Sequence, residues 1–462
     1  MTGLFAVERA AARAVGALSR RTGRGGGTTL PGRLLLRMAP DAISRLGAGL
    51  PGGSSIVSAT NGKTTTAGMI AAALRAAGRR PVHNRAGSNM TWGVATALLE
   101  QRGEEGLFEV DEAWLPRIAA DLDPSLIVLG NLFRDQLDRY GELEHLADQW
   151  AEVVAARAGR TEFALCADDP LVADLGRDRE LARRPGVTYF GIEDPSVALP
   201  ELQHAFDAKH CRRCGAPYVY ERAFVGHLGH YRCPSCGADR PAPDVVATRV
   251  ELDGMRGSRV RVRAGSAEAE LNLPLPGLYN VYNALAALAA AGRLGIALDD
   301  AVHAMGSMKA VFGRVETIDV DGKAVSILLI KNPAGANEVL RTLLLEVDGP
   351  EPSPGLDLWI ALNDGIADGR DVSWVWDADF ELLARRIRRV ACAGTRAPEM
   401  AVRLKYAGVE TDAIAVEESI EGSLDAALSS ADGALYALPT YTALLELRDL
   451  LARRGLATSY WE

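Results

Sequence analysis

A glycine turn followed by a lysine is the feature of this sequence with the clearest chemical use. The stretch SATNGKTTT, residues 58–66, follows a short apolar run and opens a helical pattern. Such a turn directs backbone N–H groups and the positive end of a helix dipole at an anion. Lys63 would reach the β- and γ-phosphates of a nucleotide, and the Thr64 hydroxyl would bind Mg²⁺. The usual pattern has a glycine where this chain has Val57, so a chance Gly-Lys-Thr at a helix start is the alternative.

Two carboxylates close a later predicted strand. In FEVDE, residues 108–112, Glu109 and Asp111 stand where open α/β sheets bind their ligands. A carboxylate in that place suits Mg²⁺, which prefers oxygen ligands. Solvated acids at a strand end are the alternative.

Four of the six cysteines form two C-x-x-C pairs, Cys211 with Cys214 and Cys233 with Cys236. Two such pairs at this separation predict one tetrahedral Zn²⁺ with four thiolate ligands. A set of four thiols leaves no open position for water, so the predicted zinc is structural. Three nearby histidines could compete as ligands: His210, His227 and His230.

Two asparagines begin a strongly helical segment, GLYNVYNALAA, residues 277–287. Asn280 and Asn283 are three apart and share one helical face. Two amides on one face can hydrogen-bond the edge of a base, but they could equally be a cap and a surface residue.

An acidic stretch with two tryptophans, residues 361–380, follows an apolar run that reads as a buried strand. Its aspartates are Asp364, Asp368, Asp371, Asp377 and Asp379. A helix is predicted over residues 377–387, with Asp377 and Asp379 as its caps. Trp374 and Trp376 are unusual in a solvated loop, and rigid aromatic faces suit an interface.

These residues need two α/β domains to position them. From about residue 54, short apolar runs alternate with helical periods, which predicts a parallel sheet with crossover helices. The alternation resumes after residue 312 without a second phosphate loop, which predicts a Rossmann-like C-terminal α/β domain. We expect an N-terminal segment over 1–50 and a central P-loop domain over 51–312. The C-terminal domain then covers 313–462, and residues 205–240 form the inserted zinc ribbon.

Composition excludes several classes of protein. The net charge of −9 over 462 residues offers no electrostatic attraction to nucleic acid. No apolar run approaches the ~18–20 residues of a membrane span. Charged residues at positions 8, 9 and 13 argue against a secretion signal and favour a basic amphipathic helix ending at Gly25–Gly27. That helix either packs on the body or contacts a membrane surface.

The lone Cys166 and Cys392 and the paired cysteines fit a reducing cytoplasm.

Six motifs occur in the order found in the ATP-dependent Mur ligase family, which the chain resembles from about residue 50 onward. They are TNGKTT, NLFRDQLDRYGE, ADDP, GLYNVYNALAA, FGRVE and KNPAGANE. The four-cysteine insertion, FRDQLDRYGE and ADGRDVSWVWD resemble most the branch of the family that amidates lipid II.

The resemblance assigns roles residue by residue. It implies an ATP site built from the phosphate loop, adenine contacts, an arginine of the C-terminal domain and a turn facing the ribose. These residues are Thr60, Asn61, Gly62, Lys63, Thr64, Thr65, Asn280, Asn283, Arg314, Lys331 and Asn332. It also implies Mg²⁺ held by Thr64 and Glu109.

Three departures from the family pattern change what is expected of the metal site and the substrate. Gln136 replaces the histidine that amino-acid-adding members use for a second metal. No lysine stands between Lys63 and Lys209, so the carbamylated lysine of those members has no counterpart. About 50 residues precede the phosphate loop, too few for a domain that grips a UDP group, which suits a lipid-linked substrate. We expect one firmly held Mg²⁺.

The resemblance implies a synthetase subunit that activates the α-carboxyl of D-Glu in the lipid II stem peptide as an acyl-phosphate. Ammonia from a glutaminase subunit of the GatD type would then give D-isoglutamine. Asp371 would complete the catalytic triad of that partner in a heterodimer, with Asp368 as the second choice. The expected location is the cytoplasm, at the inner face of the membrane. A self-sufficient Mur- or folylpolyglutamate-type ligase is the alternative, and a zinc-ribbon nucleic-acid ATPase is a third hypothesis.

Overall fold

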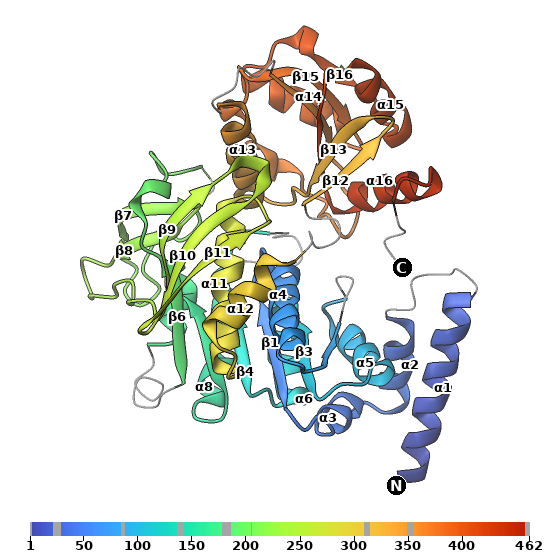
Figure 1. Ribbon diagram of the computed structural model, residues 1–462, viewed down its shortest axis with the longest axis vertical. Helices are drawn as coiled ribbons and strands as arrows, with labels where there is room; N and C mark the ends of the chain where they lie inside the picture. Colours follow the sequence, from blue (N-terminus) through green and yellow to red (C-terminus); the bar gives the residue numbers. More distant parts are fainter. Residues whose placement is uncertain are drawn as a thin grey trace.

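The computed structural model describes residues 2–21, 29–84, 88–135, 143–177, 186–204, 206–308, 315–348 and 355–457. Figure 1 shows two α/β units, one above the other, with the N-terminal helices against the lower unit. The described strands form a nine-stranded sheet, a six-stranded sheet and a separate two-stranded hairpin.

The nine-stranded sheet is the frame of the central domain. Its order is β11-β10-β9-β6-β5-β4-β1-β3-β2, and the neighbours from β9 to β2 are parallel. The strands are β1 (Ser54–Ser58), β2 (Pro81–His83), β3 (Glu105–Glu109), β4 (Leu126–Leu129), β5 (Glu162–Cys166), β6 (Val187–Ile192), β9 (Val245–Leu252), β10 (Ser258–Ala264) and β11 (Ala267–Leu273). Strands β1, β3 and β4 are buried along their whole length, as expected for strands covered on both faces.

Helices cover this sheet and place the loops at its carboxyl edge. They are α4 (Lys63–Ala76), α5 (Thr91–Glu100), α6 (Leu115–Leu122), α8 (Leu143–Arg157), α9 (Pro170–Leu175), α11 (Leu278–Arg293) and α12 (Leu298–Gly306). The alanine-rich α11 is buried over most of its length and packs against α4, β4, β5 and β6. Its small side chains allow this close approach, so its first turn lies beside the phosphate loop.

The N-terminal segment contains more structure than the one helix expected. After α1 (Thr2–Arg21) come α2 (Leu30–Met38) and α3 (Ala42–Gly47). Helix α2 packs on α5, where Gly32 N donates to Thr96 Oγ1 at 2.9 Å. A Cβ at Gly32 would lie 1.9 Å from the carbonyl oxygen of Trp92, so only glycine permits this contact. The expected stop of α1 at Gly25–Gly27 lies outside the described residues.

The C-terminal domain has a mostly parallel sheet of order β12-β13-β17-β14-β15-β16. Its strands are β12 (Val315–Val320), β13 (Lys323–Leu328), β14 (Leu356–Ala361), β15 (Ile387–Ala393), β16 (Ile414–Val416) and β17 (Leu435–Pro439). Its helices are α13 (Pro333–Val347), α14 (Ala397–Tyr406), α15 (Ile420–Ser430) and α16 (Tyr441–Arg453). The predicted fold class is confirmed, and the expected division near residue 312 falls within 309–314, outside the described part of the chain.

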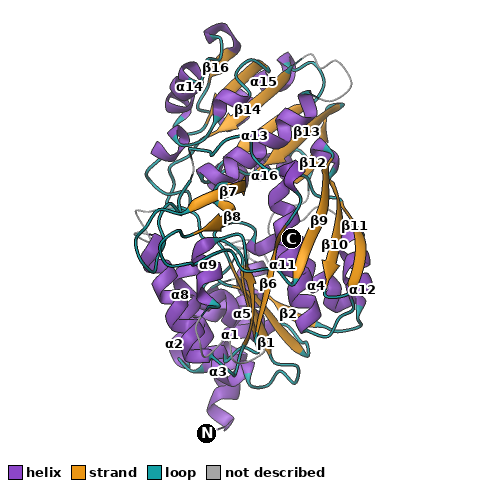
Figure 2. Cartoon of the chain, turned by 90° about the vertical axis from the view of Figure 1, so that its left-hand side faces the viewer, coloured by secondary structure: helices purple, strands orange, loops and turns teal. Residues whose placement is uncertain are grey.

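The cysteine-rich insertion forms a hairpin of β7 (Val219–Val225) and β8 (Leu228–Arg232). Figure 2 shows this hairpin at the level where the two α/β units meet. After the insertion, β9 and β10 form an antiparallel pair.

The helix predicted over residues 377–387 is wrong. The structure has two short 3₁₀ turns instead, η4 (Ser373–Trp376) and η5 (Phe380–Leu382). The buried guanidinium of Arg403 donates to the carbonyl oxygens of Val375 at 2.9 Å and Ala378 at 2.7 Å. These carbonyls lie just before and within the predicted first helical turn, and their bonds to Arg403 hold the segment in an irregular course.

The caps predicted for that helix are wrong as well. The Asp377 carboxylate lies 3.3 Å from Arg134 of the central domain. The Asp379 carboxylate accepts from Asn337 Nδ2 at 2.7 Å and lies 2.6 Å from His204 Nδ1. Both acids therefore form tertiary contacts, and Asp379 accepts no capping bond from η5.

Candidate active site

The phosphate loop lies between β1 and α4 and presses against α11. Gly62 precedes α4 with a φ of 91°, a conformation that favours glycine. A Cβ at this position would lie 1.8 Å from Asn283 Oδ1. Gly62 therefore serves both the turn and the close approach of the loop to α11.

Lys63 is buried and directed at acidic groups of its own domain. Its Nζ donates to Ala59 O at 2.6 Å and to Glu112 Oε2 at 2.7 Å. Burial lowers the pKa of Lys63, but Glu112 and Asp111 outweigh that effect and the net pKa is raised. The ammonium therefore remains charged at neutral pH, as an anion-binding lysine requires.

The two predicted magnesium ligands contact each other. Thr64 Oγ1 donates to Glu109 Oε2 at 2.7 Å. Glu109 is 2% exposed, and Asn84 holds its backbone through hydrogen bonds of 2.8 and 2.7 Å. Adjacent oxygens around an octahedral Mg²⁺ lie about 3 Å apart, so this pair fits two neighbouring positions after a small separation.

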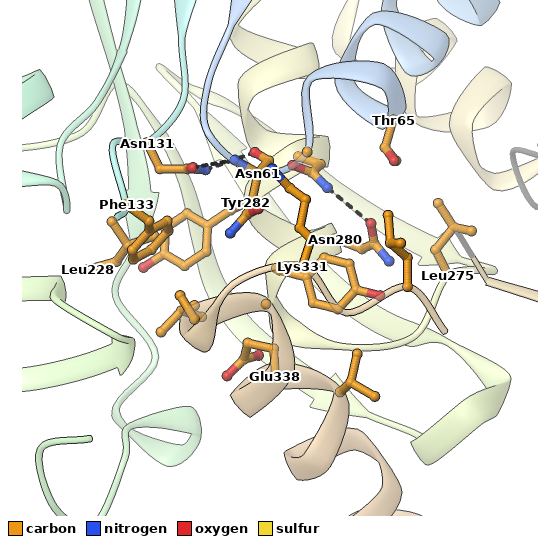
Figure 3. Close-up of a pocket in the computed structure, with 18 residues that line it drawn as sticks. Asn61, Thr65, Asn131, Phe133, Leu228, Leu275, Asn280, Tyr282, Lys331 and Glu338 are labelled. Carbon is orange, nitrogen blue, oxygen red and sulfur yellow. Dashed lines mark hydrogen bonds between the residues drawn. The ribbon is translucent and has the colours of Figure 1, made fainter. Parts of the chain in front are cut away.

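Asn280 and Asn283 are buried at the start of α11, at 2% and 5% exposure, so they are not surface residues. Asn283 Nδ2 donates to Asn280 Oδ1 at 3.0 Å, and Asn280 Nδ2 donates to Pro276 O at 2.8 Å. Both line a cavity that is partly open to solvent (Figure 3). The cavity adjoins the phosphate loop, and its lining is mainly apolar.

The C-terminal domain meets the phosphate loop through Lys331 and Asn332. Lys331 Nζ donates to Thr60 O at 3.1 Å and forms an ion pair with Asp135. The side-chain amides of Asn332 and Asn61 exchange hydrogen bonds of 3.1 and 3.0 Å. Asn332 also caps α13 by accepting from Gly335 N at 2.9 Å. These contacts join the two domains at the proposed phosphate site.

The predicted residues are thus mostly gathered in one place. The phosphate loop, Glu109, the two α11 asparagines and the Lys331-Asn332 turn lie around the carboxyl edge of the central sheet. Arg314 and Gln136 lie outside the described residues.

Three site residues were missed by the sequence reasoning. Glu112 pairs with Lys63, Asp135 pairs with Lys331, and Asn131 binds Asn61 in both directions at 2.9 and 3.0 Å. Asn131 follows the apolar strand β4 by two residues, so the rule that ligands gather at strand ends could have found it. Glu112 stands three residues after Glu109 but carried no signal of its own.

Asp368 and Asp371 differ sharply in their surroundings. Asp368 is 6% exposed and bound to Thr442, whose backbone N–H donates at 2.8 Å and whose hydroxyl also donates. Asp371 is exposed, accepts from Ser373 N at 2.8 Å, and lines a second cavity between the domains. Hydrogen bonds from Ser373 lower the pKa of Asp371, so its carboxylate is charged and reachable at neutral pH.

The four paired cysteines gather into one cluster. All four sulfur atoms lie within 4.8 Å of one another, with Cys214 Sγ 3.5 Å from Cys233 Sγ and Cys211 Sγ 3.6 Å from Cys236 Sγ. Tetrahedral thiolates at a Zn–S distance of about 2.3 Å would be about 3.8 Å apart. The cluster therefore fits a four-thiolate metal site. Burial raises the pKa of the two remaining thiols, of Cys392 to about 12 and of Cys166 also well above its usual value.

Comparison with known proteins agrees with this geometry. Residues 57–214 match the Mur ligase middle domain, and residues 329–444 match the MurT ligase C-terminal domain. The chain is 33% identical over 439 residues to the lipid II isoglutaminyl synthase (glutamine-hydrolyzing) subunit MurT of Streptococcus pneumoniae, covering 94% of both chains. It is 31% identical over 440 residues to the subunit of that name from Staphylococcus aureus N315, covering 94% and 95%.

Solved structures share the fold. A pseudomurein peptide ligase type C from Methanothermus fervidus has a TM-score of 0.68 and 24% identity, covering 87% of this chain and 79% of that one. Folylpolyglutamate synthase of Mycobacterium tuberculosis, complexed with ADP, has a TM-score of 0.61 and 15% identity, covering 91% and 94%.

The chain is therefore a member of the Mur ligase family, whose enzymes are ATP-dependent ligases that use Mg²⁺. Within that family it belongs to the MurT subunits of lipid II isoglutaminyl synthase.

The Glu112–Lys63 contact predicts a specific kinetic change. Glu112→Gln should lower kcat for ATP-dependent turnover about tenfold, because the charged partner that orients Lys63 is lost. KM for ATP should not rise, because a carboxylate that would repel the phosphates is also removed. The measurement is steady-state ADP release. Glu152→Gln, an exposed change on α8, is the matched control, and a rise in KM with unchanged kcat would contradict the role.

Proposed function

We propose that this chain uses ATP to activate the α-carboxyl of D-Glu in the lipid II stem peptide and amidates it to D-isoglutamine. The observation that carries the proposal is a charged lysine and a magnesium-type oxygen pair at the cleft between two α/β domains. The MurT relatives, named as subunits of a glutamine-hydrolysing lipid II isoglutaminyl synthase, supply the substrate class.

The reaction has two balanced steps. A carboxylate oxygen of the substrate attacks the γ-phosphorus of ATP, the bond to the β-phosphate oxygen breaks, and ADP leaves. Ammonia then attacks the acyl carbon, phosphate departs, and the nitrogen loses a proton. Lys63 and Arg314 would offset charge on the transferring phosphoryl group. Mg²⁺, held by Thr64 and Glu109, would supply further charge neutralisation.

The remaining site residues position the nucleotide. Thr60, Asn61, Gly62 and Thr65 belong to the phosphate loop and the first turn of α4, whose N-terminus favours the phosphates. Asn280 and Asn283 face the cavity beside that loop, where amides would contact the adenine. Lys331 and Asn332 would contact the ribose and phosphates from the C-terminal domain, which would tie nucleotide binding to closure of the two domains.

A glutaminase subunit of the GatD type is the proposed partner, and Asp371 is the residue offered to it. A Cys–His pair works better when a carboxylate orients the imidazole and stabilises its cation. Asp371 suits this role because it is exposed and charged, whereas Asp368 is already engaged by Thr442.

An apolar surface near Asp371 supports docking in this region. Trp376 is 51% exposed and Tyr406 is 73% exposed, with ring centroids 5.9 Å apart. The guanidinium of Arg403 lies 5.5 Å from the centroid of the Trp376 ring, within the range of a cation–π contact. Exposed aromatic side chains held in this way are typical interface anchors.

The role of Asp371 is tested by two nitrogen sources. Asp371→Asn in the complex with the glutaminase should lower glutamine-driven amidation of lipid II about a hundredfold or more, because the neutral amide does not stabilise the imidazolium. Amidation driven by added ammonium should persist. Equal loss of amidation with both nitrogen sources would refute the interface role of Asp371. If Asp368→Asn, and not Asp371→Asn, selectively loses glutamine-driven amidation, Asp368 is the residue that completes the triad.

A self-sufficient Mur- or folylpolyglutamate-type ligase, the alternative drawn from the sequence, is the second candidate. The same assay separates the two. Amino-acid addition without the partner, and no lipid II amidation with it, would favour the second candidate.

We also propose that the four-cysteine cluster holds a structural Zn²⁺. Metal analysis of the purified chain should give about one zinc per molecule, and Cys214→Ser should lose it, because three thiolates bind zinc much less well than four. Cys392→Ser, which changes a buried thiol outside the cluster, should retain the metal. A zinc-free wild-type chain that unfolds at the same temperature with and without added zinc would contradict the assignment.

Helix α1 is proposed to contact the inner face of the membrane. Leu4, Val7 and Leu18 are 69%, 65% and 62% exposed, and exposed Ala11 and Ala14 complete a stripe along one face. The helix carries four arginines and one glutamate, which suits anionic lipids. None of the helices in the described ranges is long and apolar enough to cross a bilayer.

The stripe gives a direct binding test. Leu4→Ser combined with Leu18→Ser should reduce co-sedimentation with phosphatidylglycerol vesicles about tenfold, since two apolar contacts are lost. Leu202→Ser, at a similarly exposed leucine on the body of the protein, should bind like the wild type. Equal binding by all three proteins, or no binding by the wild type, would exclude the contact.

A further inference from the structure

The cysteine-rich insertion supplies part of the wall of the nucleotide cavity. Val225 and Leu228 flank the two-residue turn of the β7–β8 hairpin and pair in register. They are 3% and 2% exposed, and both line the cavity beside the phosphate loop. In Figure 3, Leu228 lies on the same side of the cavity as Phe133. This apolar wall suits the face of a base or a ribose.

The hairpin that carries this wall belongs to neither large sheet. A two-stranded hairpin alone is marginally stable in water, so its position depends on contacts at its turn and at its base. At the turn, the His227 ring is fully buried, with its centroid 4.7 Å from that of Phe133 and its Nε2 3.3 Å from Asp169. The backbone is held as well, because Gly229 N donates to Asp168 O at 2.9 Å.

The base of the hairpin is the four-cysteine cluster. The sulfur contacts join cysteines before β7 to cysteines after β8: Cys214 with Cys233 at 3.5 Å, and Cys211 with Cys236 at 3.6 Å. A metal bound by all four thiolates would therefore fix the two ends of the hairpin relative to each other.

One buried carboxylate joins the end of the insertion to α11, another part of the cavity wall. Arg240, which follows the last cysteine pair, donates to Asp168 Oδ1 at 2.6 Å. Tyr282 of α11 lines the cavity and donates its hydroxyl to Asp168 Oδ2 at 2.7 Å. A shift of the insertion would thus be transmitted to a second part of the cavity wall.

We propose that Val225 and Leu228 determine the affinity of this cavity for its nucleotide, and that the four-cysteine metal site positions them by closing the base of the hairpin. The inference rests on the proposed ATP site, and it makes metal occupancy a determinant of nucleotide binding.

The test is calorimetric titration of the full chain with a non-hydrolysable ATP analogue and Mg²⁺. Leu228→Ala should weaken binding about tenfold, because one apolar contact with the nucleoside is lost. Leu228→Phe keeps the buried apolar character but enlarges the side chain into the cavity, and it should weaken binding without lowering the melting temperature. Val219→Ala changes the far end of β7, where the side chain is 40% exposed, and should bind like the wild type.

The metal is tested in the same assay. Removing zinc with a zinc-selective chelator should weaken analogue binding about tenfold, and adding zinc back should restore it. Circular dichroism of the metal-free chain should show the central and C-terminal domains still folded. Unchanged affinity after verified metal loss would overturn the role of the metal site.

Lys63→Ala separates this inference from the proposed function. If Lys63→Ala abolishes binding while both Leu228 variants bind like the wild type, the ATP site stands and the hairpin inference is overturned. If Lys63→Ala binds like the wild type, the proposed phosphate site is wrong. If the wild type shows no saturable binding, both proposals fail.

Discussion

Two consecutive buried carboxylates organise the functional half of this protein. Asp168 and Asp169 are both fully buried at the carboxyl end of β5. Asp169 accepts from the N–H groups of Leu132 and Leu171, while Asp168 accepts from Ile192 N and from two side chains. A buried charge is tolerated only when it is well paired and hydrogen-bonded. These requirements draw a loop, a helix start, the inserted ribbon and α11 to one point beside the nucleotide cavity.

The contacts between the two domains near the phosphate site are polar. Amides pair across the gap between Asn61 and Asn332, and an ion pair links Arg134 to Asp377. Arg341 of α13 also donates to Phe224 O of the hairpin at 3.0 Å. Polar groups of this kind can exchange one partner for another at little cost when a nucleotide or Mg²⁺ enters. These polar contacts are thus suited to rearrangement when a nucleotide binds in the cleft.

Local patterns in the sequence predicted much of this fold because strand burial and the spacing of metal ligands depend on residues close together in the chain. Short apolar runs marked most of the parallel strands, and the C-x-x-C spacing marked the cluster of four sulfur atoms. The partners of Lys63 and Lys331 were missed because they lie 49 and 196 residues away. No local pattern encodes which acid a buried lysine will meet. The helix prediction over 377–387 was wrong for the same reason. Carbonyl oxygens of this region accept hydrogen bonds from Arg403, which lies outside the predicted helix.

The burial of Cys166 and Cys392 gives the chain an internal reporter. A thiol reacts through its thiolate, and burial with a raised pKa makes both of these cysteines inert. Every other cysteine of the chain belongs to the cluster at the base of the hairpin. Uptake of a thiol-reactive dye by the native protein therefore measures a single quantity, the fraction of molecules whose ribbon is without metal.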